Sequence, residues 1–136
     1  MRQALAAGRR AGREPFVDQL DEVIRCCGTL PGSVEDYPFG DQAAVYKVGG
    51  KMFAVLGPQV DPPRVSLKLP PDEGIALRAQ YPGRVLPGYH LDKRHWNTVL
   101  LDGTLDAGEV LDLVRQSYDI IVATLPVRSR PGPAAR

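Results

Sequence analysis

Apolar positions recur at helical spacing near the start of the chain. The stripe has steps of four, three and four residues: Phe16, Leu20, Val23 and Cys27. Such a stripe gives a helix one apolar face to pack against a core. Pro15 suits a first helical turn and Gly28 a left-handed C-terminal position. The pattern therefore predicts a helix from residue 14 or 15 to Cys27.

A second long stripe lies near the end of the chain, and its members are Ala107, Leu111, Val114, Tyr118, Ile121 and Leu125. Asp106 followed by Glu109 fits a capping box, and Pro126 ends the helix. A third, short helix is expected to start at Pro71 and to end before Tyr81, because two acids favour its first turn.

A tight hairpin is predicted in the middle of the chain. Gly49-Gly50 separates two strand-like segments, 43–48 and 51–56. In the expected register Tyr46 opposes Phe53 and Val48 opposes Lys51 on one face. The other face then carries four residues: Val45, Lys47, Met52 and Ala54.

Two more strands are predicted, at 64–69 and 96–101. The first alternates cleanly, with Val65, Leu67 and Leu69 facing inward and with Arg64, Ser66 and Lys68 facing outward. The segment 29–40 is expected to be a connector and 84–95 to be mostly loop, because turn-forming residues are frequent in both.

These elements predict an α+β fold, since the strands come as antiparallel neighbours and not as βαβ units. We expect a single-domain antiparallel β-sheet with the N- and C-terminal helices packed on one face, a two-layer sandwich. The folded domain should span 14–126, with a disordered basic arm at 1–13 and a disordered basic tail at 127–136. The uncovered face of the sheet would carry Lys47, Arg64, Ser66 and Lys68.

Charge is unevenly distributed along the chain, although the net charge is only +1. The arm and the tail hold seven arginines and no acids, so the region from Glu14 to Pro126 has 10 basic and 16 acidic residues, a net charge of −6. Within that region, 43–98 reverses the sign with eight basic residues against four acids. A basic middle flanked by acidic helices predicts a polarised molecule.

Several classes of protein are not supported by the sequence. The chain has no long apolar run and no signal-peptide pattern, so a cytoplasmic protein is expected. Cys26 and Cys27 are adjacent and are predicted to be free buried thiols. No nucleophile elbow, phosphate-binding loop or metal-binding motif is present. We therefore expect no enzymatic activity, no cofactor and no metal.

Basic residues on strands and loops are the best functional candidates. Five of them are expected on one sheet face and its neighbouring loop: Lys47, Arg64, Lys68, Lys93 and Arg94. Lysine and arginine neutralise phosphates, and binding then gains from counterion release. A solvated strand face also carries charges in many proteins, so this reading competes with a purely structural one.

Several short motifs occur in order along the chain. They are Tyr37-Pro38-Phe39-Gly40, Lys51-Met52-Phe53-Ala54, Ser66-Leu67-Lys68, Pro87-Gly88-Tyr89-His90 and His95-Trp96-Asn97-Thr98. With them the chain resembles the MmcQ/YjbR family of small bacterial proteins. The resemblance implies a compact domain of frataxin-like shape with a double-wing DNA-binding motif, its wings near 47–51 and 93–97. It adds Lys51, Tyr89, His95 and Asn97 to the candidate DNA contacts.

Two other functions compete with DNA binding. The segment from Tyr89 to Trp96 is rich in aromatic residues and arginine, which protein interfaces favour, so it is also a candidate docking loop for a partner protein. A small-molecule site near His90 and His95 is a further alternative. Trp96 itself opens a strand, and a lone tryptophan at such a position is typical of a core anchor.

Overall fold

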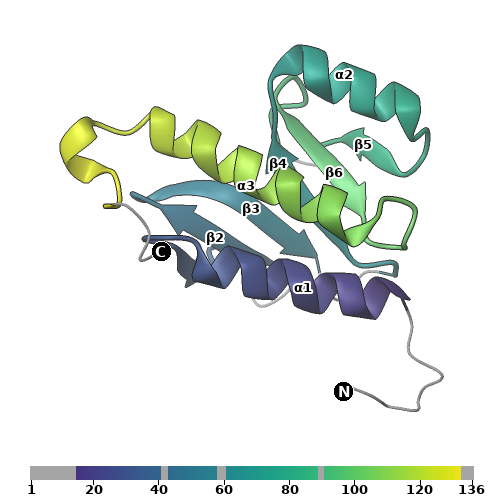
Figure 1. Cartoon of the computed structure of the whole chain (residues 1–136), viewed down its shortest axis with the longest axis horizontal. Coiled ribbons are helices and arrows are strands. Elements are labelled where there is room, and N and C mark those ends of the chain that lie inside the picture. Colours follow the sequence, from purple (N-terminus) through teal and green to yellow (C-terminus); the bar gives the residue numbers. More distant parts are fainter. Residues whose placement is uncertain (1–14, 41–42, 58–60, 89–90, 133–136) are drawn as a thin grey trace.

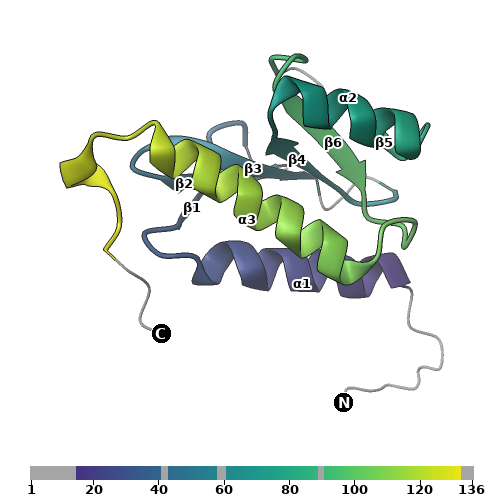
Figure 2. The same cartoon turned by 45° about the horizontal axis from the view of Figure 1, so that its top comes forward.

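A computed structural model describes residues 15–40, 43–57, 61–88 and 91–132 of the chain. In this part, three α-helices pack on one face of a six-stranded sheet (Figure 1). The helices are α1 (Pro15–Thr29), α2 (Pro71–Gln80) and α3 (Ala107–Ala123). Figure 2 shows α3 lying between α1 and α2. The predicted basic arm at 1–13 lies outside the described residues.

The sheet is antiparallel throughout, with the strand order β1-β2-β3-β4-β6-β5. Its strands are β1 (Val34–Asp36), β2 (Ala44–Val48), β3 (Lys51–Gly57), β4 (Arg64–Lys68), β5 (Val85–Pro87) and β6 (Trp96–Leu100). The predicted α+β single-domain fold is confirmed. The two edge strands, β1 and β5, are short and fall in the segments that we expected to be a connector and mostly loop.

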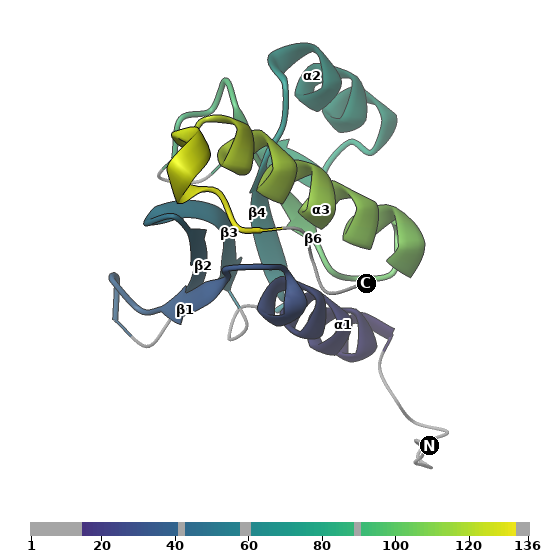
Figure 3. The same ribbon diagram turned by 60° about the vertical axis from the view of Figure 1, so that its left-hand side comes forward.

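The main core lies between the sheet and the helices. Phe53, Leu67 and Val99 are fully buried there, and the Phe53 and Tyr118 rings meet edge to face with centroids 5.3 Å apart. Figure 3 shows the end of α3 near the β2–β3 hairpin. A Cβ on Gly49 would lie 2.6 Å from Leu125, so the hairpin tip packs against that end without room for a side chain.

The hairpin register differs in part from the prediction. Val48 opposes Lys51 as expected, but Tyr46 opposes Ala54 because a β-bulge in β3 adds Phe53 as an extra residue. The register between β3 and β4 ends at Ala54 and Leu67. Beyond that point the Ser117 hydroxyl bridges the strands: it donates to the Phe53 carbonyl at 2.6 Å and accepts from the Lys68 amide at 2.8 Å. A side chain of α3 thus completes the sheet at the bulge.

Polar contacts fix the ends of the helices. The Asp106 side chain accepts a hydrogen bond from the Glu109 amide at 2.7 Å, as the capping box predicts. The Glu109 carboxylate accepts one from the Tyr81 hydroxyl at 2.9 Å, which joins the start of α3 to the end of α2. In the loop before α3, the Gln19 side chain accepts from the Gly103 amide at 3.2 Å and donates to the Leu105 carbonyl at 2.7 Å.

The start of the predicted tail is ordered in the structure, contrary to expectation. Val127–Ser129 form a 3-10 turn, and the Arg130 guanidinium donates to the carbonyls of Leu125 and Ala123 at the end of α3. These carbonyls lack partners within the helix, and a cation there is favourable. Residues 133–136 lie outside the described part. Within the described residues, none of the helices has the length and apolar character needed to cross a membrane.

Candidate nucleic-acid interface

The sheet face opposite the helices carries the predicted basic residues of β4. Val65 and Leu67 belong to the core under the helices, so their neighbours Arg64, Ser66 and Lys68 point to the other side. We call this side the helix-free face. Cross-strand pairing places Trp96 opposite Lys68 on the same face.

The centre of the helix-free face is buried, which corrects the expectation of a solvated surface. Ser66 and Thr98 are 8% and 3% exposed, and their hydroxyls form a hydrogen bond of 2.8 Å. Val45, on the same face of β2, is fully buried. Ser66 points outward as predicted, but it pairs with Thr98 and not with water.

Lys47 lies on this face and is already paired. Its ammonium is 2.8 Å from the Asp36 carboxylate of the neighbouring strand β1. The hydrogen bond from Lys47 is the main cause that lowers the pKa of Asp36. Lys47 therefore contributes less free positive charge than its position in the sequence suggests.

Lys51, a candidate contact of the hairpin wing, is on the other side of the sheet from Lys47. It opposes Val48, which is part of the core under the helices. Its ammonium lies 3.2 Å from the Thr124 hydroxyl, at the C-terminal end of α3. A cation at this end of a helix is favourable, which gives Lys51 a structural role.

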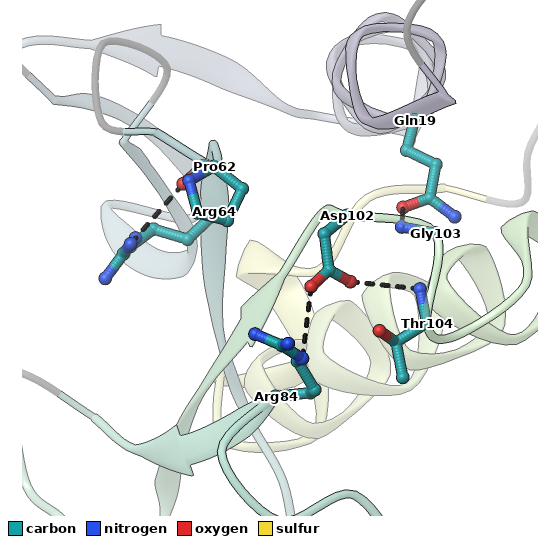
Figure 4. A network of polar contacts seen from close by, with 7 residues as sticks. All are labelled: Gln19, Pro62, Arg64, Arg84, Asp102, Gly103 and Thr104. Atoms are coloured by element: carbon teal, nitrogen blue, oxygen red, sulfur yellow. Dashed lines mark hydrogen bonds and ion pairs between the residues drawn. The ribbon is translucent and has the colours of Figure 1, made fainter.

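Arg64 stands at the far end of β4 from Lys68. Its Nη2 donates to the Pro62 carbonyl at 3.4 Å, whereas its buried Nε has no hydrogen-bond partner. Figure 4 shows its side chain extending away from the nearby ion pair of Arg84 and Asp102. In that pair the Arg84 Nε is 3.3 Å from the Asp102 carboxylate. Arg64 and Lys68 are four positions apart in β4, about 13 Å along the strand.

Three of the remaining candidates meet in a tight turn before β6. We call the residues Asp92–Trp96 the Asp92 turn. The Asp92 carbonyl accepts from the amides of His95 at 3.3 Å and Trp96 at 2.9 Å. The turn joins β4 directly, because the Leu69 amide donates to the His95 carbonyl at 2.8 Å. Lys68 is thereby brought beside a loop that presents Lys93, Arg94 and His95.

The cations of this cluster are available for a ligand. Lys93 and Arg94 are exposed, and the Lys93 ammonium donates to the Gly88 carbonyl at 3.2 Å. Neither the Lys68 ammonium nor the Arg94 guanidinium forms an ion pair or hydrogen bond with another described residue. The His95 Nδ1 lies 2.8 Å from the Asp92 carboxylate, and this contact is the main cause that lowers the pKa of Asp92.

Asn97 is fully buried, so its assignment as a DNA contact was wrong. Its side-chain oxygen accepts from the Arg78 guanidinium of α2, and its amide donates to the His95 carbonyl at 3.3 Å. A Cβ on Gly74 would lie 2.8 Å from that oxygen, so α2 packs tightly on this residue. Trp96 is 8% exposed, which confirms its expected role as a packed anchor. Tyr89 and His90 lie outside the described residues.

The comparisons with known proteins identify the family. The YjbR family profile matches residues 28–120. The chain belongs to the YjbR family. It is 35% identical over 111 residues to the uncharacterized protein YjbR of Escherichia coli K12, covering 82% of this chain and 93% of the relative. It is 32% identical over 100 residues to the uncharacterized protein YbdF of Escherichia coli O157:H7, covering 71% and 81%.

A solved structure from the same comparison has a similar fold. The crystal structure of the Deinococcus radiodurans protein DR2400 matches with a TM-score of 0.77 and 39% sequence identity, covering 81% of this chain and 83% of that one. The fold shared with that structure therefore extends over most of this chain.

The sequence analysis of this YjbR-family chain did not identify two residues that shape the candidate interface. Asp92 organises the turn, and Arg78 holds Asn97 from the side of α2. An aspartate side chain often accepts from the backbone amide two residues further on in an Asx turn, so the segment Asp92-Lys93-Arg94 contained a usable signal. The role of Arg78 depends on the packing of α2 on β6, which local sequence does not reveal.

Metal and small-molecule sites gain no support at this surface. Across the described ranges, no group of three His, Cys, Asp or Glu residues is placed to hold a metal ion. A hollow of about 290 Å³ lies between α1 and α3, among Cys26, Leu30 and Leu111. It is on the helical side of the protein and does not include His95.

Proposed function

We propose that this protein binds DNA in the cytoplasm, without catalysing a reaction, through phosphate contacts at the Asp92 turn and Lys68. The main support is the convergence of four predicted contacts from β4 and from the turn between β5 and β6: Lys68, Lys93, Arg94 and His95. Of the two wings that the family resemblance implies, the one near 93–97 carries these groups. Lys51 in the other wing faces the helices.

The distribution of charge supports an approach from the helix-free face. The three α-helices together carry eight acids and three basic residues, a net charge of −5. All three pack on the opposite face of the sheet. A polyanion is therefore repelled by the helical side and attracted by the side that presents Lys68 and the Asp92 turn.

The expected binding mode is contact with the phosphate backbone. No α-helix in the described part of the chain lies on the helix-free face, so no helix there is available to enter a major groove. Phosphate contacts carry little sequence information and depend strongly on salt. We therefore expect salt-sensitive binding with weak sequence preference.

The test is a titration of fluorescein-labelled duplex DNA with the full chain at several salt concentrations. A variant with glutamine at Arg2, Arg9, Arg10 and Arg13 separates the arm from the folded domain. In that background, Lys68→Ala with Arg94→Ala should weaken binding and reduce the salt slope by about 0.9 for each lost contact.

Lys51→Ala is the matched control for one of these charges, because it removes the same charge from the opposite side of the sheet. It should weaken binding only slightly. If Lys68→Ala weakens binding no more than Lys51→Ala does, DNA is not bound at the proposed surface. If the arm variant does not bind DNA at all, the folded domain is not the binding unit.

Binding of a partner protein is the second candidate function. One observation favours it at the edge strand β1, away from the predicted Tyr89–Trp96 loop. Trp96 is buried, but Val34, Tyr37 and Phe39 are 50–61% exposed at and just after the edge strand β1. Exposed apolar groups gathered within six residues are typical of interaction surfaces. Loss of a captured partner in Phe39→Ser, with no change in Trp96→Phe, would support this role and place it away from the Asp92 turn.

A further inference from the structure

We infer that Asp92 is a positioning residue for phosphate binding, so that removing this acid weakens the binding of an anion. The inference rests on the proposed function and identifies what holds its basic groups in place. The expected effect is opposite to that of simple electrostatics, because a carboxylate beside a phosphate site repels the ligand and its removal would then strengthen binding.

The Asp92 side chain uses both of its oxygens inside the turn. One carboxylate oxygen accepts from the Arg94 amide at 3.0 Å, and the other lies 2.8 Å from the His95 Nδ1. Its backbone carbonyl accepts from the amides of His95 and Trp96. One residue therefore fixes the backbone at Arg94 and the ring of His95 together.

Other contacts hold the ends of the turn but leave its middle to Asp92. The His95 carbonyl is bound by the Leu69 amide, and the Trp96 carbonyl accepts from the Gly88 amide at 2.8 Å. A Cβ on Gly88 would lie 2.7 Å from the Trp96 Cβ, so this junction is closely packed. In the described residues the only contact to the Arg94 backbone amide comes from Asp92.

The location of Asp92 means that its charge and its hydrogen bonds have opposite effects on the binding of an anion. Its side chain is 59% exposed and lies in the same turn as Lys93, Arg94 and His95. The contact with His95 lowers the pKa of the carboxyl, so the negative charge is present at neutral pH. If Asp92 acted only through its charge, replacing it would strengthen the binding of DNA.

Two variants with the same charge separate positioning from electrostatics. Asp92→Ala removes the acceptor for the Arg94 amide, whereas Asp92→Asn keeps an oxygen that can accept this bond. Loosening the backbone at Arg94 and the ring of His95 before binding should weaken affinity by about fivefold to tenfold, which we expect for Asp92→Ala. Asp92→Asn should recover part of the loss. Asp61→Asn, an exposed acid outside the turn, should bind as well as the parent or slightly better.

The experiment uses the full chain with the arm arginines replaced, titrated against fluorescein-labelled duplex DNA at constant salt. A second readout excludes a general structural effect: in a Lys93→Ala, Arg94→Ala, His95→Ala background, Asp92→Ala should cause no further loss. Circular dichroism and thermal unfolding establish that each variant is folded.

Each result decides a separate question. Equal or tighter binding by Asp92→Ala, with the parent protein binding, overturns the inference and leaves the proposed function standing. A loss that persists in the Lys93→Ala, Arg94→Ala, His95→Ala background also overturns it, because Asp92 would then not act through those residues. No binding by the parent protein removes the proposed function and the inference with it.

Discussion

The two faces of the sheet bury their residues by different means. Under the helices, Phe53, Leu67 and Val99 form a continuous apolar core with side chains of α1 and α3. On the helix-free face, Val45 is equally buried, and the same face also holds the hydrogen-bonded pair of Ser66 and Thr98. The first face is packed against the helices mainly by apolar contact, with Asn97 and Ser117 as hydrogen-bonded exceptions, whereas the second has no helix over it and depends on a satisfied polar pair at its centre.

This difference makes it possible to test stability and binding separately. The core residues of the helix-covered face are buried, so they are expected to affect folding only. The helix-free face has a buried centre and cations at its border, so stability and binding lie close together there. Variants at the centre should change the free energy of unfolding, whereas variants at Lys68 and the Asp92 turn should change DNA binding.

The largest expected effect is on the helix-covered face. Phe53→Ala removes a fully buried ring that contacts Tyr118, and it should lower the free energy of unfolding by about 3–5 kcal/mol. Val45→Ala, on the other face, removes less volume and should cost about 2 kcal/mol. Urea unfolding measures both. A Val45→Ala variant as stable as the parent protein would mean that the helix-free face is not packed.

Asn97→Ala should also destabilise the fold, by about 1–3 kcal/mol, because the Arg78 guanidinium loses its partner. At temperatures where the variant is folded, its affinity for DNA should equal that of the parent protein. The opposite result, full stability with loss of DNA binding, would restore Asn97 as a direct contact.

Alkaline pH should lower the free energy of unfolding, through the Cys27 thiol that is buried on the helix-covered side. Burial raises the pKa of the Cys27 thiol to about 12, whereas an unfolded cysteine ionises near pH 8.5. The unfolded chain therefore releases its proton first, and stability is complete below this pH and falls as pH rises toward 12. The loss is at most about 1.4 kcal/mol per pH unit. Urea unfolding between pH 8 and 10.5 should show a shallower dependence in Cys27→Ala.

The smallest effect is expected at the polar pair of the helix-free face. Ser66→Ala leaves the Thr98 hydroxyl without its partner and should cost about 1 kcal/mol. The double variant Ser66→Ala, Thr98→Val should cost less than the sum of the two single variants, because no hydroxyl is left unpaired. Additive costs in this cycle would show that the two hydroxyls do not depend on each other.

Sequence patterns predicted the elements better than they predicted the contacts. The three helices follow from apolar stripes and from caps such as Asp106, and the hairpin follows from Gly49-Gly50. The bulge at Phe53 was missed because it depends on packing against α3, which alternation along a strand does not report. The strands β1 and β5 were missed because three residues are too few for a pattern to stand out.

The candidate site was predicted as one group of basic and polar residues. In the structure only some of these residues lie close together. Lys68, Lys93, Arg94 and His95 come together because β4 and β6 are neighbours in the sheet, although 25 positions separate Lys68 from Lys93. Lys51 lies apart from them because it opposes Val48, a pairing that we predicted. The burial of Asn97 depends on α2, which lies 17 or more residues earlier in the chain.

The short strands at the borders of the sheet have a consequence for the behaviour of the protein at high concentration. Exposed sheet edges are where separate molecules add strands to one another and begin to aggregate. Here β1 contains Glu35 and Asp36, and β5 ends in Pro87, which has no amide hydrogen to donate. Both edges therefore resist the addition of a further strand, which favours solutions that stay free of fibrils and precipitate during storage.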